Sequence, residues 1–158
     1  MKRIFLSLGS NLGDREANLR DALKRLESPR LHVTRLSSFY ETEPIGLTGQ
    51  PWFLNVVAEA DTSLFPLMLL NHTQHVERAM GRRKTVLNGP RKIDIDILLY
   101  SHLVIDTRKL CIPHARMHER RFVLEPMIEL APDLPHPVLR KTMLDLFTAV
   151  KGQAARRR

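Results

Sequence analysis

The sequence predicts an α+β fold: a ferredoxin-like βαββαβ antiparallel sheet covered by helices on one side, with an added hairpin strand and C-terminal helices. Strand-like and helix-like segments follow one another in that order as far as residue 100. The chain has 158 residues, of which 43% are hydrophobic, which is enough for one domain with its own core. No repeat or linker divides it, so residues 1–158 are expected to form a single domain.

The first strand and the first helix are predicted by a change in the spacing of apolar residues along the chain. Residues 2–8 alternate as a strand does, and "GSNLGD" then interrupts the pattern. Residues 14–28 follow with a helical pattern, and Pro29 ends it. The apolar residues on one face of this helix are Leu19, Ala22, Leu23 and Leu26.

Two more strands and a second helix complete the first part of the pattern. Residues 31–42 and 52–62 are rich in β-branched and aromatic residues, and a loop containing Pro and Gly separates them. Ser63 is expected to cap a helix over about 64–80, which ends near Gly81.

The stretch "GPRKIDIDILLY", residues 89–100, predicts a buried strand because isoleucines and aspartates alternate along it. A hairpin turn is expected at Ser101–His102, followed by the added strand. Beyond Pro113, helices are predicted over residues 120–130 and 139–151, and residues 153–158 are expected to be a frayed tail.

Asp94 and Asp96 are the first candidates for chemistry. Side chains two residues apart on a strand point to the same side, with Cα atoms about 6.6 Å apart. Carboxylates so placed can hold Mg²⁺, which also takes oxygen ligands from phosphates. The alternative is a solvated strand face carrying two charges.

The segment that precedes the two aspartates favours a metal site over a solvated strand face. Residues 81–92 contain Arg82, Arg83, Lys84, Arg91 and Lys92 and no acidic residue. Arginine binds phosphate oxygens in pairs, so a metal site beside such a loop suits a polyphosphate. The net charge of +8 also indicates an anionic partner, and nucleic acid, a membrane surface and a phosphorylated small molecule all remain open at this point.

Two other motifs allow two interpretations each. "GSNLGD" can hold phosphate at a helix N-terminus, but it lacks the signature of a P-loop, and a glycine-dependent turn is the preferred interpretation. His114 lies in a second basic segment with Arg116, Arg120 and Arg121, where it can bind phosphate or pack against the core.

Cysteine content and hydropathy indicate the compartment. The single Cys111 cannot form an internal disulfide, and Met1–Gly9 is too short for the apolar part of a signal peptide. No apolar run is long enough to span a bilayer. A cytoplasmic protein without a membrane partner is expected.

Five motifs in the chain carry a family resemblance: "GSNLG" at 9–13, "SSFYETEPIG" at 37–46, "FLN" at 53–55, "GPRKIDIDILL" at 89–99 and "IPHARMHERRFVLEPMIELAP" at 112–132. Together they resemble the 6-hydroxymethyl-7,8-dihydropterin pyrophosphokinase family of folate biosynthesis. The resemblance covers nearly the whole chain. It implies an enzyme that transfers pyrophosphate from ATP to the hydroxymethyl group of the pterin and releases AMP. A monomer that binds no nucleic acid is expected.

The resemblance also implies a role for each matching residue. Asp94 and Asp96 match the ligands of two Mg²⁺ ions, and ATP is the co-substrate. The catalytic candidates are Arg82, Arg91 and His114. The ATP-binding candidates are Gln74, Glu77, Arg83, Arg91, Ile97, His114 and Arg120. The pterin-binding candidates are Thr42, Pro44, Ile45, Phe53, Asn55 and Phe122.

An RNA-binding module is the alternative, since a βαββαβ sheet with a basic surface also describes an RNA-recognition domain. Such a domain displays stacking aromatic residues on its sheet. This chain has Asp94 and Asp96 on the corresponding strand, where they would repel a phosphate backbone unless metals intervene.

Overall fold

The computed structural model describes residues 1–46, 49–81, 89–152 and 155–158. The elements in chain order are β1 (Lys2–Ser10), α1 (Arg15–Leu26), β2 (Leu31–Leu36), β3 (Tyr40–Thr42), β4 (Phe53–Thr62), α2 (Pro66–Ala79), β5 (Asp94–Tyr100), β6 (Ile105–Asp106), β7 (Cys111–Ile112), the 3₁₀ helix η1 (Met117–Glu119), α3 (Arg121–Leu130), α4 (Met143–Ala149) and β8 (Ala155–Arg157). No helix among the described residues is long and apolar enough to cross a membrane.

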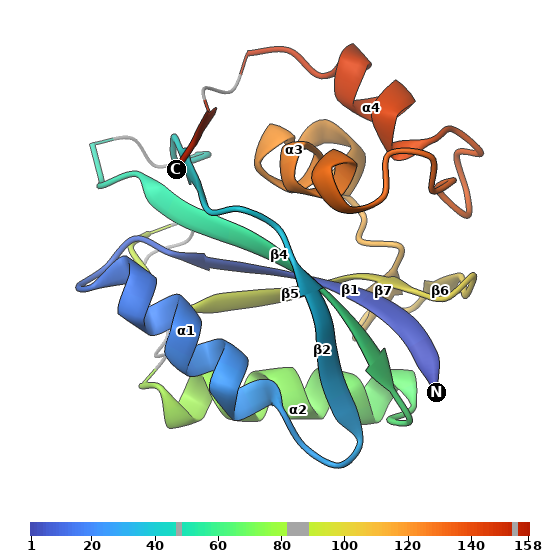
Figure 1. Ribbon diagram of the computed structural model, residues 1–158, viewed down its shortest axis with the longest axis horizontal. Helices are drawn as coiled ribbons and strands as arrows, with labels where there is room; N and C mark the ends of the chain where they lie inside the picture. Colours follow the sequence, from blue (N-terminus) through green and yellow to red (C-terminus); the bar gives the residue numbers. More distant parts are fainter. Residues whose placement is uncertain (47–48, 82–88, 153–154) are drawn as a thin grey trace.

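A six-stranded antiparallel sheet forms the centre of the molecule (Figure 1). Its strands follow the order β5-β1-β4-β3-β8, and β2 also pairs with β4. β4 is ten residues long, so one half of it pairs with β2 and the other half with β3. The predicted strand over residues 31–42 is therefore two strands. The predicted α+β class with an antiparallel sheet is confirmed.

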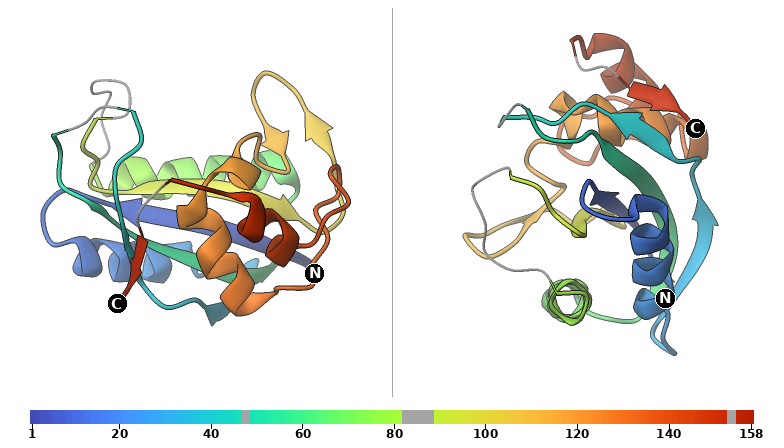
Figure 2. Two further views of the ribbon diagram at one scale, coloured as in Figure 1. Left: turned by 90° about the horizontal axis from the view of Figure 1, so that it is seen from above. Right: turned by 90° about the vertical axis from the view of Figure 1, so that its left-hand side faces the viewer.

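Helices cover both faces of the sheet, which corrects the prediction that they cover one. α1 and α2 pack against one face, and α3 and α4 against the other (Figures 1 and 2). The alternation along β1 explains this arrangement, because Ile4, Leu6 and Leu8 belong to the first core cluster and Phe5 to the second. Phe5 is only 2% exposed, so the second face also needs an apolar cover.

The segment after β5 differs from the predicted hairpin. The chain does turn at Ser101, which has a φ of 51°. The next strand, β6, does not return along β5 and pairs with β7 in a separate two-stranded sheet. The outer edge of β5 instead receives residue 114, whose backbone N–H donates to Leu98 O at 2.9 Å.

The first two helices begin in different ways, one with a side-chain cap and one with proline. Asp14 caps α1, its side chain accepting from the backbone N–H of Ala17 at 3.1 Å. The prediction that Ser63 caps α2 is wrong, because α2 begins at Pro66 and the Ser63 hydroxyl accepts from Arg30 Nε instead. Proline needs no hydrogen-bond acceptor at a helix start, so this helix forms without a side-chain cap.

Residues 155–158 are ordered against the sheet, contrary to the predicted frayed tail. β8 pairs with β3, with Arg157 opposite Tyr40 and Arg156 opposite Glu41. Arg156 and Arg157, which the sequence suggests are solvated, form ion pairs with Glu41 and Glu129. Arg156 and Glu41 are 115 residues apart in the chain, so the local sequence pattern does not reveal this pair.

Candidate active site

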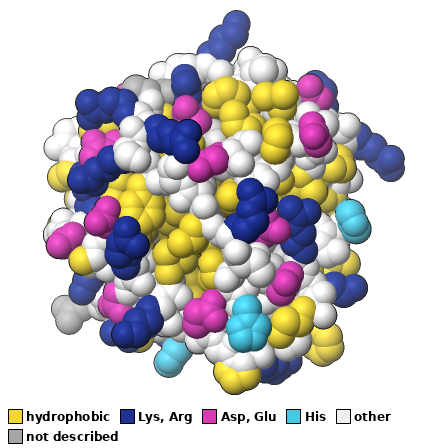
Figure 3. Space-filling view, viewed as in Figure 1, with side chains coloured by type: hydrophobic (Ala, Val, Ile, Leu, Met, Phe, Trp, Pro, Cys, Tyr) yellow, Lys and Arg dark blue, Asp and Glu magenta, His cyan; other side chains and the backbone are white. Residues whose placement is uncertain are grey.

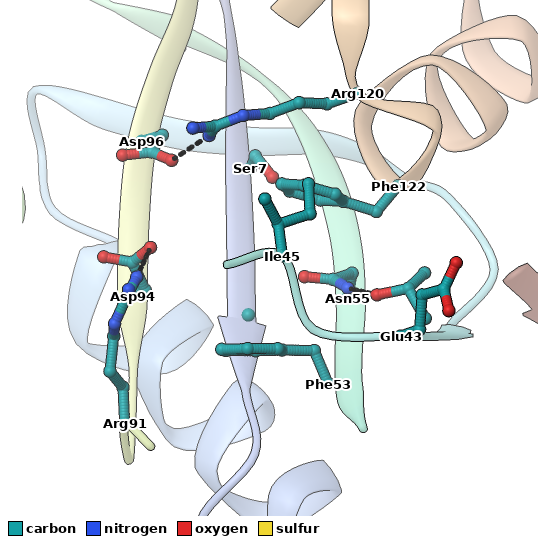
Figure 4. A pocket seen from close by; sticks show the side chains of 12 residues that line it. Ser7, Glu43, Ile45, Phe53, Asn55, Arg91, Asp94, Asp96, Arg120 and Phe122 are labelled. Carbon is teal, nitrogen blue, oxygen red and sulfur yellow. Dashed lines mark hydrogen bonds and ion pairs between the residues drawn. The ribbon is translucent and has the colours of Figure 1, made fainter. Parts of the chain in front are cut away.

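An open pocket lies on the sheet face that α3 and α4 cover, at the end where β1 leads into the turn before α1 (Figure 4). It encloses about 570 Å³, counting the part open to solvent. The residues that line it are Ser7, Gly9, Thr42, Glu43, Ile45, Phe53, Asn55, Arg91, Asp94, Asp96, Arg120 and Phe122.

The floor of the pocket is one row across three neighbouring strands. Gly9 on β1 lies opposite Asp94 on β5 on one side and opposite Asn55 on β4 on the other. Side chains of directly paired residues emerge on the same face of a sheet. Two strand spacings of about 4.8 Å separate Asp94 from Asn55, so the aspartate and the amide lie roughly 10 Å apart with the glycine between them.

Gly9 keeps this floor open. A Cβ at this position would lie 2.5 Å from Asn55 Oδ1 and 3.4 Å from Phe53 Cδ1. The first distance is shorter than any normal contact, so every side chain larger than that of glycine would displace the amide. Gly9, the first glycine of "GSNLG", is thus required for close approach on a strand, whereas Gly13, with a φ of 73°, serves the predicted glycine-dependent turn.

Aromatic rings border the Asn55 half of the pocket. Phe53 and Phe122 lie on either side of Asn55 (Figure 4), Phe53 coming from β4 and Phe122 from the first turn of α3. Each ring also has an arginine near its face, Arg91 at 6.0 Å from Phe53 and Arg120 at 5.5 Å from Phe122. This geometry provides a slot for a flat ring.

A hydrogen bond to a neighbouring strand orients the amide of Asn55. Its Nδ2 donates to the hydroxyl of Thr42, and both residues are buried. Asn55 Oδ1 is then the atom next to Gly9 and the pocket. Thr42, Glu43 and Ile45 line the same side, whereas the predicted Pro44 does not.

The other half of the pocket is ionic. Arg91 Nη1 lies 3.0 Å from Asp94 Oδ2. Asp96 Oδ2 lies 3.8 Å from His114 Nε2 and 4.0 Å from Arg120 Nη1. The two aspartates thus occupy the same side of β5, as predicted, with cationic groups around both (Figure 4).

His114 is held as a neutral imidazole beside Asp96. Burial lowers its pKa to about 4, helped by Arg120 and Arg116 and opposed by Asp94. Its Nδ1 accepts from the backbone N–H of Arg116 at 3.2 Å, so in the neutral ring Nε2 carries the proton. Nε2 lies 3.8 Å from Asp96 Oδ2, so this N–H is close to the carboxylate, although His114 itself does not line the pocket.

The donor set of this half fits Mg²⁺ with phosphate rather than a metal site made by protein alone. No group of three or more His, Cys, Asp or Glu side chains able to hold a metal occurs among the residues described. Mg²⁺ is commonly held by one or two carboxylates, with substrate phosphates and water completing its shell. Asp94 and Asp96 supply such a pair.

The "GSNLGD" segment proves to be a structural junction. Asn11 is 2% exposed, its Oδ1 accepts from the backbone N–H of Arg91 at 2.8 Å, and its Nδ2 donates to Gln50 and Pro51. It therefore fixes where Arg91 enters the pocket. Asn18 donates back to Ser10 and Leu12, which closes the turn before α1.

The structure brings some of the predicted residues together and leaves others outside. Glu77 lies at the outer edge of β5, where its Oε2 accepts from the backbone N–H of Ile95 at 2.8 Å. Gln74 on α2 and Ile97 on β5 do not line the pocket, and Ile97 is part of the core. Arg82 and Arg83 lie outside the described residues.

Sequence reasoning missed Ser7, Gly9 and Glu43. Ser7 lies opposite Asp96 and Gly9 opposite Asp94, so both positions follow from the register between β1 and β5. The alternation in β1 contains the signal, since Ser7 and Gly9 share one face, but the register is needed to place them. Glu43 lies within the quoted "SSFYETEPIG" and could have been found there.

The sequence matches the model of the family described as "7,8-dihydro-6-hydroxymethylpterin-pyrophosphokinase (HPPK)" over residues 5–132. It is 47% identical over 127 residues to the 2-amino-4-hydroxy-6-hydroxymethyldihydropteridine pyrophosphokinase of Bacillus subtilis, a match that covers 80% of this chain and 76% of that protein. It is 41% identical over 156 residues to the folic acid synthesis protein fol1 of Schizosaccharomyces pombe, covering 98% of this chain and 21% of that protein.

Solved structures support the fold. An HPPK-DHPS crystallised in complex with substrates superposes with a TM-score of 0.75 and 16% identity, covering 94% of this chain and 43% of that chain. This chain therefore spans about a fifth of the yeast relative and less than half of the solved protein. The family model covers most of the chain and the Bacillus relative most of its own length, so this chain belongs to the 7,8-dihydro-6-hydroxymethylpterin-pyrophosphokinase (HPPK) family.

Proposed function

We propose that the protein transfers the β,γ-pyrophosphoryl group of ATP to the hydroxymethyl group of 6-hydroxymethyl-7,8-dihydropterin, giving the pterin diphosphate and AMP. The observation that carries the proposal is the row Asp94, Gly9 and Asn55. It joins an ionic half and an aromatic half in one pocket with an open floor between them. A flat heterocycle and a metal-bound polyphosphate can therefore meet there.

The aromatic half suits the pterin. Phe53 and Phe122 can stack on the two faces of the ring system, because the slot between them is bordered by ring carbons. Asn55 can hydrogen-bond to the polar edge of the ring through Oδ1, and Thr42 and Ile45 can close the same side. The roles given to these residues, and to Pro44, by the family resemblance remain part of the proposal.

The ionic half suits the triphosphate. Two Mg²⁺ ions held by Asp94 and Asp96 would neutralise charge on the phosphates during transfer. Arg91 and Arg120 can each bind phosphate oxygens with paired N–H groups once the nucleotide is present. Neutral His114 can donate from Nε2 to the migrating group. Gln74, Glu77 and Ile97 are proposed as nucleotide-site residues, as are Arg82 and Arg83.

The transfer needs no covalent intermediate on the enzyme. The pterin hydroxymethyl oxygen attacks the β-phosphorus in line with the bond to the oxygen that AMP retains, and the hydroxyl proton is lost. The described residues contribute mainly by holding the two substrates together and by stabilising the charge that develops, as in other phosphoryl transfers.

The RNA-binding alternative lacks support in this architecture. An RNA-recognition domain binds RNA on an open sheet face, and here helices cover both faces. On the face shown in Figure 3, basic side chains are interspersed with acidic and hydrophobic ones and form no continuous basic stripe.

Three further properties belong to the same proposal. The strand order β5-β1-β4 with β2 beside β4 supports a ferredoxin-like arrangement, extended by β3 and β8. The free Cys111 supports a reducing compartment such as the cytoplasm. A monomer is proposed as the oligomeric state.

A coupled assay for AMP tests the proposal. Purified protein, MgATP and 6-hydroxymethyl-7,8-dihydropterin should yield AMP, and omission of the pterin should abolish its formation. AMP formation at the same rate without the pterin would contradict the proposed acceptor. A shift of a homopolymer RNA in a gel, without AMP formation, would favour the binding module.

A further inference from the structure

Strand β8 completes the sheet beside the aromatic half of the pocket. It pairs with β3 through Ala155 opposite Thr42 and Arg156 opposite Glu41, and the backbone N–H of Arg158 donates to Phe39 O at 2.8 Å. β3 is three residues long and has β4 on its other side. Without β8, this short strand would lie at the edge of the sheet.

Three arginines converge on Glu41, the middle residue of β3. Arg15 Nη2 lies 2.9 Å from Glu41 Oε1, Arg158 Nη1 lies 3.7 Å from the same oxygen, and Arg156 Nη2 lies 3.2 Å from Oε2. A single exposed ion pair stabilises a protein little, but a network around one carboxylate fixes its position more firmly. The network joins α1, β3 and β8.

A second contact holds α3 to the same strands. Arg157 Nη2 lies 3.3 Å from Glu129 Oε2 on α3, and Arg157 Nε donates to the Ser38 hydroxyl at 3.0 Å. Glu129 also accepts from the backbone N–H of Ser38 and from the hydroxyl of Tyr40. Since α3 carries Phe122 and β3 ends with Thr42, this contact joins two walls of the pocket.

The third contact lies where β4 begins. The guanidinium of Arg156 lies 5.1 Å from the ring centroid of Trp52, and Arg15 Nη1 donates to Trp52 O at 3.1 Å. Trp52 directly precedes Phe53, one of the two rings of the slot, and is the single tryptophan of the chain. The arginine cluster thus contacts the segment that positions Phe53.

We propose that Arg156 and Arg157 are positioning residues for the pterin, which they do not touch; the inference rests on the proposed function. They hold β3, Trp52 and α3 in the arrangement that places Thr42, Phe53 and Phe122 around one slot. Asn55 depends on this arrangement because its amide is oriented by Thr42. In the ATP half, Asp94 and Asp96 lie on β5 and Arg91 precedes it, and neither β8 arginine contacts these residues. Only Arg120, the residue before α3, adjoins an element that Arg157 contacts.

The expected change in pterin affinity follows from the fraction of molecules whose pocket has the arrangement that binds the pterin. If loss of β8 lowers that fraction to about one fifth, the apparent Kd for the pterin rises about five-fold, while the Kd for nucleotide stays unchanged. A general loss of stability would weaken the binding of both ligands together. The change in the Kd of the pterin relative to that of the nucleotide therefore identifies a positioning role.

The test compares the double variant Arg156→Ala/Arg157→Ala with wild type. Calorimetry gives the Kd of the pterin in the presence of a nonhydrolysable ATP analogue and Mg²⁺, and separately the Kd of the analogue. Acrylamide quenching of Trp52 fluorescence reports whether the ring has lost the cover that Arg156 of β8 gives it. In the double variant we expect the Kd of the pterin to rise about five-fold, the Kd of the analogue to stay unchanged and the quenching of Trp52 to increase.

Two control variants sharpen the comparison. Arg3→Ala removes an arginine with the same two kinds of contact, an ion pair to Glu59 at 2.9 Å and a ring contact with Phe5 at 4.9 Å, but at the far end of β1. It should leave pterin binding unchanged. The double variant Arg156→Lys/Arg157→Lys keeps both charges and should recover part of the affinity.

Two results would overturn the inference. Unchanged quenching of Trp52 in the alanine variant would mean that β8 does not cover it, and increased quenching with unchanged pterin affinity would mean that β8 positions nothing. Failure of the proposed function would appear differently, as wild-type protein that forms no AMP with the pterin, whatever the quenching shows.

Discussion

Arg91 forms an ion pair with Asp94, its Nη1 atom lying 3.0 Å from Oδ2. The same guanidinium lies 6.0 Å from the ring centroid of Phe53. One side chain thus touches both halves of the pocket, and Asn11 fixes its backbone. The ion pair also explains how two carboxylates on one strand face are tolerated: Arg91 is the counterion of Asp94, and Arg120 and His114 lie beside Asp96.

Replacing either aspartate by asparagine should abolish turnover and leave the fold intact. Asp94→Asn and Asp96→Asn keep the shape of the side chain and remove the charge that would hold Mg²⁺, so we expect AMP formation to fall by about 10²-fold or more. Asp61→Asn, at the other end of β4, is the control and should retain activity. Near-normal magnesium-dependent turnover in either site variant would refute the metal assignment.

Phe122→Ala should weaken pterin binding far more than ATP binding. Stacking of an aromatic ring on a flat base contributes about 1–3 kcal/mol, so the Kd for the pterin should rise by between about five-fold and about 150-fold. Phe65→Ala is a matched control, because Phe65 is 70% exposed and lies at the start of α2. Equal losses for both ligands in calorimetry would argue against the aromatic slot.

Gly9→Ala should damage the floor of the pocket. The added methyl group would lie 2.5 Å from Asn55 Oδ1, so the amide must move and its hydrogen bond to Thr42 must distort. We expect at least about ten-fold weaker pterin binding, corresponding to about 1.4 kcal/mol. A crystal structure of the variant with Asn55 unmoved and normal affinity for the pterin would disprove the role given to Gly9.

Glu129 should make stability depend on pH in the acidic range. Burial acts to raise its pKa, but hydrogen bonds from Ser38 and Tyr40 and the charge of Arg157 outweigh burial, so the pKa lies below its ordinary 4.5. A carboxylate with a lowered pKa stabilises the fold above its unfolded pKa, and this stability is lost as the pH falls through the folded pKa.

Glu129→Gln therefore has two expected effects. At neutral pH it should lower the free energy of unfolding by about 1–3 kcal/mol, because a charged acceptor of several hydrogen bonds is replaced. Between about pH 5 and about pH 3 its stability should fall less than that of wild type. Urea unfolding at several pH values measures both, and parallel pH curves for the two proteins would show that Glu129 does not contribute.

The sequence predicted the elements whose periodicity is local. The Ile–Asp alternation of residues 93–97 correctly placed the isoleucines in the core and the aspartates on the pocket side, because a strand has a period of two. The C-terminal helix α4 is shorter than predicted, since Thr142 and Asp145 form a reciprocal cap that starts the helix at Met143. Local patterns define an element well and its ends less well.

What the sequence could not predict depends on partners distant in the chain. The pocket floor requires the register that sets Gly9 between Asp94 and Asn55. The arginines of β8 pair with Glu41 and Glu129, and a run of arginines does not by itself predict which carboxylates it will pair with. The roles of Arg82 and Arg83 fall outside the described residues and stay predictions.

Product analysis tests the central claim most directly. Protein, MgATP and 6-hydroxymethyl-7,8-dihydropterin are incubated, and phosphorus NMR with mass spectrometry identifies the products. Transfer of the β,γ unit predicts AMP and a pterin diphosphate in equal amounts, with attack at the β-phosphorus. Formation of ADP and a pterin monophosphate would show attack at the γ-phosphorus and contradict the account.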